Sequence, residues 1–422
     1  MTSKSLSMPL QIILLKKSKE VKYMERNEFI DYLKNQPIMN SHSHHLPDNH
    51  HSKLTLRGVL HNSYVNWCGT PVPSGDSEEE IATWLNAVRT RSYFVWLEKA
   101  LMDLYCIDEH ISAESWDVYD TAIRQAHQDR DWHLGLLKEK CGYKAVLLDT
   151  YWSPGQDNGH PDLFKPAYRI NSFFYGYNQT ARDHNGNNIQ VMHNQRITDI
   201  DEYTDFIYRV LKERKQAGCV ALKCALAYDR SLAFGEATKE EAQRAMVNEP
   251  DMMDIKKFQD YVFDCVCKMA AQLNMPIQIH TGLGLMVGSN AMQLQPLIAR
   301  NTDTTFLLMH GSYPWIGDIA GLTHNYPNVW ADICWLPLIS SAAAYSLLHE
   351  LIDVCDANRV VWGCDTWTGE ESYGARLAFL DVLSRVLYER VEAGLLNEHD
   401  ARHYAKAIMH DNAERLLGMG HQ

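Results

Sequence analysis

The sequence predicts a (β/α)8 barrel of the TIM type, an α/β fold, with a helical insertion after the first strand. Eight apolar runs are spaced along residues 38–366, and helical patterns fill most of the gaps between them. The runs are continuously apolar, which is typical of parallel strands covered on both faces. Eight such strands with intervening helices match the arithmetic of a barrel. A doubly wound open sheet is the competing fold, but no GxGxxG motif follows an early strand.

Each expected strand is a short apolar run tipped by polar residues. The strands are expected at residues 38–44, 143–150, 169–176, 219–228, 275–281, 304–311, 328–333 and 359–366. Helical stripes between them include residues 255–273, 341–356 and 372–394, and the segment "ARHYAKAIMHDNAERLLGM" is expected to close the chain as a helix.

The first and second strands are separated by about a hundred residues without strand signals. Within this stretch, residues 78–105 and 113–140 carry apolar side chains at helical spacing. We therefore expect residues 46–140 to be a helical insertion in a barrel domain of residues 36–422. Residues 1–35 are expected to form an extension and a first helix, and the apolar run near residue 10 is too short for a membrane span and lacks a cleavage site.

Composition and net charge limit the kinds of molecule that the protein is expected to bind. The chain of 422 residues is 45% hydrophobic and 22% charged, as is usual for a globular protein with a substantial core. A net charge of -13 without a basic stripe argues against a nucleic-acid partner. Ten cysteines without a CxxC pair favour a reducing cytoplasm. We expect a homo-oligomer that acts on a small molecule, with no membrane partner.

Titratable side chains gather where the expected strands end, the edge at which TIM barrels carry their active sites. Side chains two apart on a strand point the same way, so His42 and His44 can bind one ion. A single strand histidine is often only a packed core residue. Here several such residues fall at one end of one barrel, which favours a site. The others are Lys223, His280, His310 and Asp365.

These residues stand in short motifs that resemble the amidohydrolase superfamily, especially its amidohydrolase-2 branch. The motifs are "HSH", "QIHTG", "LLMHG", "GCDT" and the closing "NAERLLG". The resemblance implies a metal-dependent enzyme that hydrolyses C–N or C–O bonds, with isomerisation as a less common activity. It also implies that the metal ligands are His42, His44, His280 and Asp365, and that His310 orients the attacking water or binds a second metal.

Two features depart from the family patterns. Asn40 stands where an acidic residue is common, so we expect an altered metal affinity. The helical insertion resembles that of the uronate isomerases. Those enzymes usually carry Asp-Ser-Arg at the eighth strand, however, and this chain has Asp365, Thr366 and Trp367. The missing arginine counts against a uronate substrate.

Lys223 leaves the number of metal ions open. A lysine within an apolar run is costly unless it is neutralised, paired or modified. A carbamylated Lys223 would bridge two ions, as in binuclear relatives. An unmodified Lys223 would bind substrate beside one ion, or form an ion pair with an unidentified carboxylate. Imidazole and carboxylate ligands suit zinc best, and we favour one ion.

The preferred function is a metal-dependent hydrolase of a small, anionic molecule that uses a metal-activated water. Asp365 is expected to accept the proton of that water, with His310 and Lys223 as further catalytic residues. A uronate or sugar-acid aldose-ketose isomerase is the alternative, and a non-catalytic metabolite-binding barrel is less favoured. His45, His50 and His51 are expected on the loop that leaves the first strand. Substrate contacts are expected from the loops after the strands, at Arg169, Tyr228, Arg230, Trp315 and Trp367.

Overall fold

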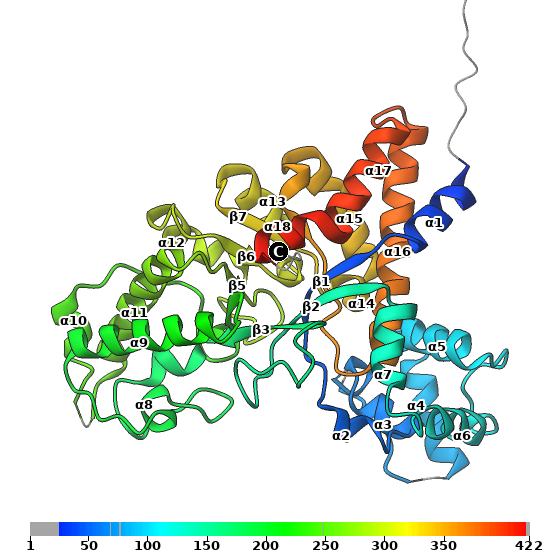
Figure 1. Cartoon of the computed structure of the whole chain (residues 1–422), viewed down its shortest axis with the longest axis horizontal. Helices are drawn as coiled ribbons and strands as arrows, with labels where there is room; N and C mark the ends of the chain where they lie inside the picture. Colours follow the sequence, from blue (N-terminus) through cyan, green and yellow to red (C-terminus); the bar gives the residue numbers. More distant parts are fainter. Residues whose placement is uncertain (1–24, 68, 76, 248, 419–422) are drawn as a thin grey trace, which may run out of the picture.

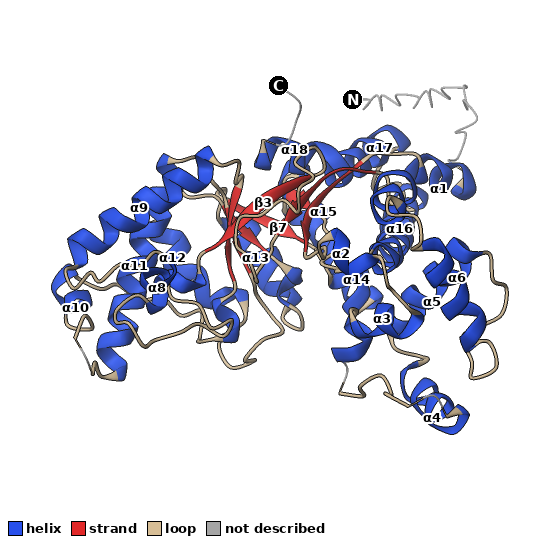
Figure 2. Ribbon diagram, turned by 60° about the horizontal axis from the view of Figure 1, so that its bottom comes forward, coloured by secondary structure: helices blue, strands red, loops and turns tan. Residues whose placement is uncertain are grey.

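Eight parallel strands follow one another in chain order in the computed structural model, which describes residues 25–67, 69–75, 77–247 and 249–418. Each strand pairs with the next one along the chain, in the order β1 to β8. The strands lie at the centre of the molecule, with helices on either side (Figures 1 and 2). They are β1 (Ile38–Ser43), β2 (Tyr143–Leu148), β3 (Phe164–Arg169), β4 (Ala221–Cys224), β5 (Ile277–Ile279), β6 (Phe306–Leu308), β7 (Val329–Asp332) and β8 (Val360–Val361).

Backbone hydrogen bonds between the first and last strand segments close the barrel. The amide of Ser41 donates to the carbonyl of Trp362 at 3.1 Å, and the amide of Asp365 donates to the carbonyl of His42 at 2.9 Å. The side chain of Asn40 accepts the amides of both His42 and Cys364. Asn40 thus holds the two segments together. The predicted (β/α)8 barrel is confirmed.

Helices lie in every connection between consecutive strands except that between β2 and β3, where residues 149–163 form no helix, and a larger helical insertion separates β1 from β2. The insertion lies on one side of the barrel, opposite α8 to α11 (Figure 1). Its helices are α2 (Asp48–His51), α3 (Leu56–His61), α4 (Glu78–Val88), α5 (Ser92–Tyr105), α6 (Trp116–Ala126) and α7 (Trp132–Gly135). The remaining helices are α1 (Arg26–Lys34), α8 (Ile189–Met192), α9 (Ile200–Gln216), α10 (Lys239–Gln243), α11 (Met252–Gln272), α12 (Gln295–Arg300), α13 (Ile316–Asn325), α14 (Leu336–Ile339), α15 (Ser341–Val354), α16 (Gly369–Glu392), α17 (Glu398–Lys406) and α18 (Asn412–Leu417).

The insertion has a hydrophobic core of its own and also packs against the barrel. Val88, Phe94 and Leu97 from α4 and α5 are buried together with residues of α3 and α6. The hydroxyls of Thr55 and Ser77 cap α3 and α4 by accepting amide hydrogens of the first turn. The long helix α16 lies against α5 and joins the insertion to the end of β8.

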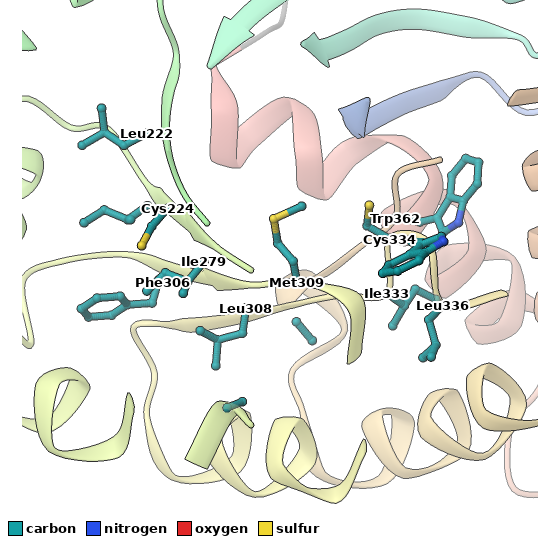
Figure 3. Close-up of a cluster of buried hydrophobic side chains, with 14 of the residues drawn as sticks. Leu222, Cys224, Ile279, Phe306, Leu308, Met309, Ile333, Cys334, Leu336 and Trp362 are labelled. Carbon is teal, nitrogen blue, oxygen red and sulfur yellow. The ribbon is translucent and has the colours of Figure 1, made fainter. Parts of the chain in front are cut away.

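The barrel core is built from the continuous apolar runs. Ile279, Phe306 and Leu308 are fully buried on β5 and β6, and Met309 and Trp362 extend the same cluster towards β8 (Figure 3). Burial of both faces of these strands explains why their sequences do not alternate between apolar and polar residues.

The predicted third strand, residues 169–176, is wrong. The strand is Phe164–Arg169, and Asn171–Tyr175 is a 3-10 helix. Pro166 lies within β3, and proline weakens the sequence signal of a strand because it cannot donate a backbone hydrogen bond. Arg169 therefore ends the third strand, where side chains reach the active-site edge of a barrel.

The interpretation of residues 1–23 as an extension falls outside the described residues. Among the helices that the structure describes, none combines the length and the apolar character needed to cross a membrane.

Candidate metal centre and active site

His42 and His44 direct one ring nitrogen each towards the same point at the C-terminal end of β1. The Nδ1 atom of His42 lies 3.2 Å from the Gln278 side-chain oxygen, and Nδ1 of His44 lies 2.7 Å from the Asp149 carbonyl. Both partners are acceptors, because the Gln278 amide nitrogen donates elsewhere, to the Ser41 carbonyl. Each Nδ1 must therefore carry the proton, which leaves the lone pair on Nε2.

The carboxylate of Asp365 lies close to the Nε2 atoms of both histidines. Its Oδ1 atom lies 3.3 Å from Nε2 of His42 and 3.1 Å from Nε2 of His44. One nitrogen of each imidazole and one carboxylate oxygen therefore converge in a buried site.

The backbone at this end of the barrel is strained. His310, Trp335 and Asp365 follow β6, β7 and β8, and all three have positive φ angles of 65°, 63° and 57°. Non-glycine residues rarely adopt this conformation, and it persists where the surrounding structure enforces it, commonly at functional sites. The strain accompanies the turn of each chain segment away from its strand.

Lys223 lies on β4, as predicted, and is almost fully buried. Its Nζ atom lies 3.2 Å from Nε2 of His42 and 2.8 Å from the sulfur of Met309. Burial lowers the pKa of Lys223, and the charges of Asp149 and Asp365 oppose that effect. Within the described chain no carboxylate forms a direct ion pair with Lys223, so the ion-pair interpretation of this lysine has no support.

His280 and His310 lie beside each other, with ring centroids 4.4 Å apart. The Nε2 atom of His280 is 2.5 Å from the Leu283 carbonyl and must donate to it, which leaves the lone pair on Nδ1. The Nδ1 atom of His310 lies 3.7 Å from Asp365, and its Nε2 atom is buried without a hydrogen-bond partner. Burial lowers the pKa of His280 to about 3, with the Lys223 charge adding to the effect. Both rings are therefore neutral at pH 7.

A cavity of about 330 Å³ opens above these residues at the C-terminal edge of the barrel. It is lined by charged and polar side chains from the strand ends and by aromatic side chains from the surrounding loops. The lining comprises His44, Tyr64, Trp67, Tyr151, Arg169, His184, Asn185, Lys223, Ala225, Tyr228, His280, His310, Asp365 and Trp367.

Three of the five predicted substrate contacts, Arg169, Tyr228 and Trp367, line the cavity. The other two do not. Arg230 instead forms an ion pair with Asp260 at 3.0 Å, and Trp315 is the residue before α13. A loop position after a strand places a side chain near the active-site edge, but it does not determine whether the side chain turns inwards.

Arg169 is held in place by Asp149. Its Nη2 and Nε atoms donate to the two Asp149 oxygens at 2.6 and 3.2 Å, and Nη1 donates to Asn185. Burial would raise the pKa of Asp149, but the Arg169 charge holds it below its usual range. The two charges cancel, so this arginine is oriented towards the cavity with little net charge of its own.

Tyr64 and Trp67 are cavity residues that sequence reasoning missed. Both belong to the 3-10 helix Tyr64–Trp67 of the insertion. Tyr64 stacks on Trp335 with ring centroids 4.3 Å apart, and its amide donates to Glu371 at 2.7 Å. Burial, together with the nearby Asp365 carboxylate, raises the phenol pKa well above its usual value. Strand ends carry no signal for residues that approach from an insertion.

The chemistry of the donor set fits a divalent metal ion. Potential ligand atoms of His42, His44 and Asp149 lie within 4.8 Å of one another, and so do those of His310, Cys334 and Asp365. Asp149 is already engaged by Arg169, whereas Asp365 Oδ1 is a buried oxygen without a hydrogen-bond donor. An ion held by His42, His44 and Asp365 would satisfy that oxygen and use two lone pairs that the hydrogen-bond network presents.

A family model described as amidohydrolase matches residues 248–419. The protein fluG of Emericella nidulans is 33% identical over 157 residues, which are 36% of this chain and 18% of that protein. The match therefore spans less than a fifth of that relative.

Solved structures match over almost the whole chain. Glucuronate isomerase from Caulobacter crescentus has a TM-score of 0.75 at 14% identity, covering 98% of both chains. Uronate isomerase from Thermotoga maritima has a TM-score of 0.72 at 16% identity, covering 93% of this chain and 97% of that one. A proposed metal-dependent hydrolase from Lactobacillus casei ATCC 334 gives 0.69 at 16% identity, over 92% and 97%. At these identities the likeness establishes the fold alone, and the family-model match over residues 248–419 confirms the predicted resemblance to the amidohydrolases.

Proposed function

We propose that the protein is a metal-dependent hydrolase of a small anionic molecule, with one zinc ion held by His42, His44 and Asp365. The observation that carries this proposal is the orientation of the two imidazoles. Acceptors at both Nδ1 atoms leave both Nε2 lone pairs within 3.3 Å of one carboxylate oxygen. His280, with its Nδ1 lone pair in the same cavity, is the proposed fourth ligand.

Proton transfer is assigned to Asp365. A divalent ion at this position supplies a Lewis acid that lowers the pKa of a water molecule and polarises the scissile group. Asp365 is ionised and can accept the proton of the attacking water and return it to the leaving group. The partnerless Nε2 atom of the neutral His310 can orient that water, and Lys223 can donate to a substrate oxygen.

The charges around the cavity favour an anionic substrate. Asp149 cancels Arg169, and Asp365 can balance Lys223, so a divalent ion would leave the site positive. Two of the five N–H donors of Arg169 can still face a substrate carboxylate, since the other three go to Asp149 and Asn185. The faces of Tyr64, Trp67 and Trp367 suit a ring or the apolar face of a sugar.

A substrate panel tests the proposal. Zinc-loaded full-length protein is incubated with small carboxylates that carry an amide, a lactone or an ester, and hydrolysis is followed by acid release in a pH-stat. At least one class is expected to be cleaved, and a His42→Asn/His44→Asn variant should lose that activity. Cleavage that persists undiminished in this variant would refute a role for the metal centre.

Uronate or sugar-acid isomerisation is the second candidate, and Tyr64 favours it. The neutral phenol of Tyr64 lies beside the ionised Asp365, so a proton donor and a proton acceptor face the same cavity. Such a pair could move a proton between neighbouring carbons of an aldose. Trp367 occupies the position of the arginine that uronate isomerases usually carry. Formation of keto-sugars from D-glucuronate or D-galacturonate, without hydrolysis of the panel, would favour the isomerase.

The choice between one ion and two depends on Lys223. Carbamylation would turn this lysine into an anionic ligand and recruit His280 and His310 to a second ion. With an unmodified Nζ only 3.2 Å from His42 Nε2, we favour one ion. A mass increase of 44 Da on the peptide containing Lys223 would show the modification. A homo-oligomeric state and a cytoplasmic location also remain predictions of the sequence.

A further inference from the structure

A second group of histidines lies outside the active-site cavity, where the insertion meets the loop after β1. His51 ends α2, His127 follows α6 and His133 lies on α7. Their exposed fractions are only 4%, 3% and 3%. We call these three residues, together with Glu370 at the start of α16, the insertion histidine cluster.

The rings of the cluster are nearly parallel. His51 stacks on His133 with centroids 3.6 Å apart and planes inclined by 13°. His127 lies on a plane 18° from that of His51, at 6.3 Å. The Nε2 atom of His127 lies 2.7 Å from Glu370, which also accepts the hydroxyl of Tyr105. This carboxylate–histidine pair is the kind of contact that orients a metal-binding imidazole through its other nitrogen.

Several nitrogens of the cluster have no hydrogen-bond partner. Both ring nitrogens of His133 and Nδ1 of His51 are buried and unpaired among the described residues. Nε2 of His51 donates to the Leu46 carbonyl at 2.9 Å, so its Nδ1 atom carries the lone pair. Burial lowers the pKa of His51 and of His133, which disfavours protonation of their lone pairs. A buried unpaired polar atom costs about 1–3 kcal/mol, so this cluster calls for a ligand.

A cavity of about 480 Å³ lies against the cluster. The three histidines line it together with three carboxylates, Asp48, Asp129 and Asp131. Arg130 is its sole basic partner on the lining, so the charge of the cavity favours a cation. Imidazole and carboxylate donors are the ligand types of Zn²⁺, Ni²⁺ and Cu²⁺.

We propose that the insertion histidine cluster is a second binding site, distinct from the active site, for a divalent transition-metal ion. His51 and His133 lie face to face in this structure, so one of the two rings must rotate about its side-chain torsions before both nitrogens reach one ion. Because His51, His127 and His133 come from α2, from the residue after α6 and from α7, the bound ion would fasten these three parts of the insertion to one another.

Zinc stoichiometry tests this proposal. Untagged full-length protein is stripped with a chelator, dialysed against Zn²⁺ and then against buffer, and the zinc retained per chain is measured by mass spectrometry. The variants are His51→Gln and His133→Gln. A matched control is His410→Gln, which removes a histidine from the half-buried group of His410, Asp411 and Glu414 on the closing helices.

The wild type and His410→Gln are expected to retain one more zinc per chain than His51→Gln and His133→Gln. A His42→Asn variant should lose the other equivalent and should still gain in melting temperature when zinc is added. This result separates the second site from the active site, whatever reaction the latter catalyses. Equal zinc in the wild type and in both cluster variants, or loss of the equivalent only in His410→Gln, would overturn the proposal. If His133→Gln does not fold, His51→Gln still tests the proposal, because His51 lies at the end of a short helix.

Discussion

Two groups of histidines begin in the same twelve residues, 40–51, and differ in what holds their rings. At the active site, Gln278 and Asp149 fix His42 and His44 so that both Nε2 atoms meet one oxygen of Asp365. In the insertion histidine cluster, His51 and His133 stack face to face with unpaired nitrogens. The difference indicates that the orientation of imidazoles at the proposed metal centre depends on the acceptors behind them.

The largest effect is expected from Asp365→Asn, the change that removes the carboxylate on which the active-site histidines converge. Loss of the ligand charge and of the proton acceptor should lower kcat/KM by about 10³-fold or more. The measurement is initial rate against the best substrate of the panel, with zinc content determined in parallel. If the variant kept its activity, the active-site half of the comparison would fail.

Glu370 contacts His127 of the insertion histidine cluster, and the adjacent Glu371 accepts the amide of Tyr64 beside the active-site cavity. The pKa values of the two glutamates shift in opposite directions. Burial raises the pKa of Glu371 from 4.5 to about 8. The folded state then holds a proton that the unfolded state releases, so this residue destabilises the fold increasingly as pH rises from about 4.5 to 8. Glu371→Gln mimics the protonated acid and should remove this loss, a gain of at most a few kcal/mol at pH 8.

Urea unfolding of metal-free wild type and Glu371→Gln at pH 5.5 and pH 8.5 measures the effect. The free energies of unfolding should agree more closely at the lower pH and diverge at the higher pH, with the variant more stable. Parallel pH profiles would show that Glu371 is ionised in the folded protein.

Glu370→Gln should act in the opposite sense. Burial opposes ionisation of Glu370, but the hydrogen bond and charge of His127 lower its pKa to about 2. Its contribution to stability is therefore complete above about pH 4.5 and is lost as pH falls towards 2. The amide keeps the shape but weakens the bonds to His127 and Tyr105, which should cost about 1–3 kcal/mol at pH 7. Activity of the folded variant should be unchanged, and a fall as large as that of Asp365→Asn would erase the distinction between the two regions.

Trp67→Ala should have the smallest effect. Trp67 is 57% exposed at the mouth of the cavity and contacts Trp367 with ring centroids 5.6 Å apart. Loss of one aromatic face should raise KM by about 2- to 10-fold and leave kcat and the melting temperature unchanged. A change in kcat without a change in KM would contradict its assignment to the rim of the cavity.

The barrel could be predicted because its strands are buried on both faces and read as continuous apolar runs. The strand ends then located His42, His44 and Asp365, whose atoms the fold brings together from opposite ends of the chain. The third strand was missed because Pro166 interrupts its pattern. Site residues can be located from predicted strand ends where the strands themselves carry the reactive side chains.

The remaining cavity residues could not be predicted because no local pattern records their neighbours. Gln278 is a polar residue inside β5, and its role appears only when its oxygen is seen 3.2 Å from His42. Tyr64 reaches Asp365 through the tertiary packing of the insertion. Arg230 and Trp315 failed as cavity residues for the same reason, since local sequence does not fix which way a loop side chain turns.

Tyr64 and Trp67 line the active-site cavity although they belong to the insertion and not to the barrel strands. The proposed ligands lie at the ends of the barrel strands, whereas part of the wall that would meet substrate lies in residues 46–140. Mutations in that stretch could change which molecules are accepted while the metal chemistry stays intact. Exchange of the whole insertion between barrels of this type would be a direct way to transplant selectivity.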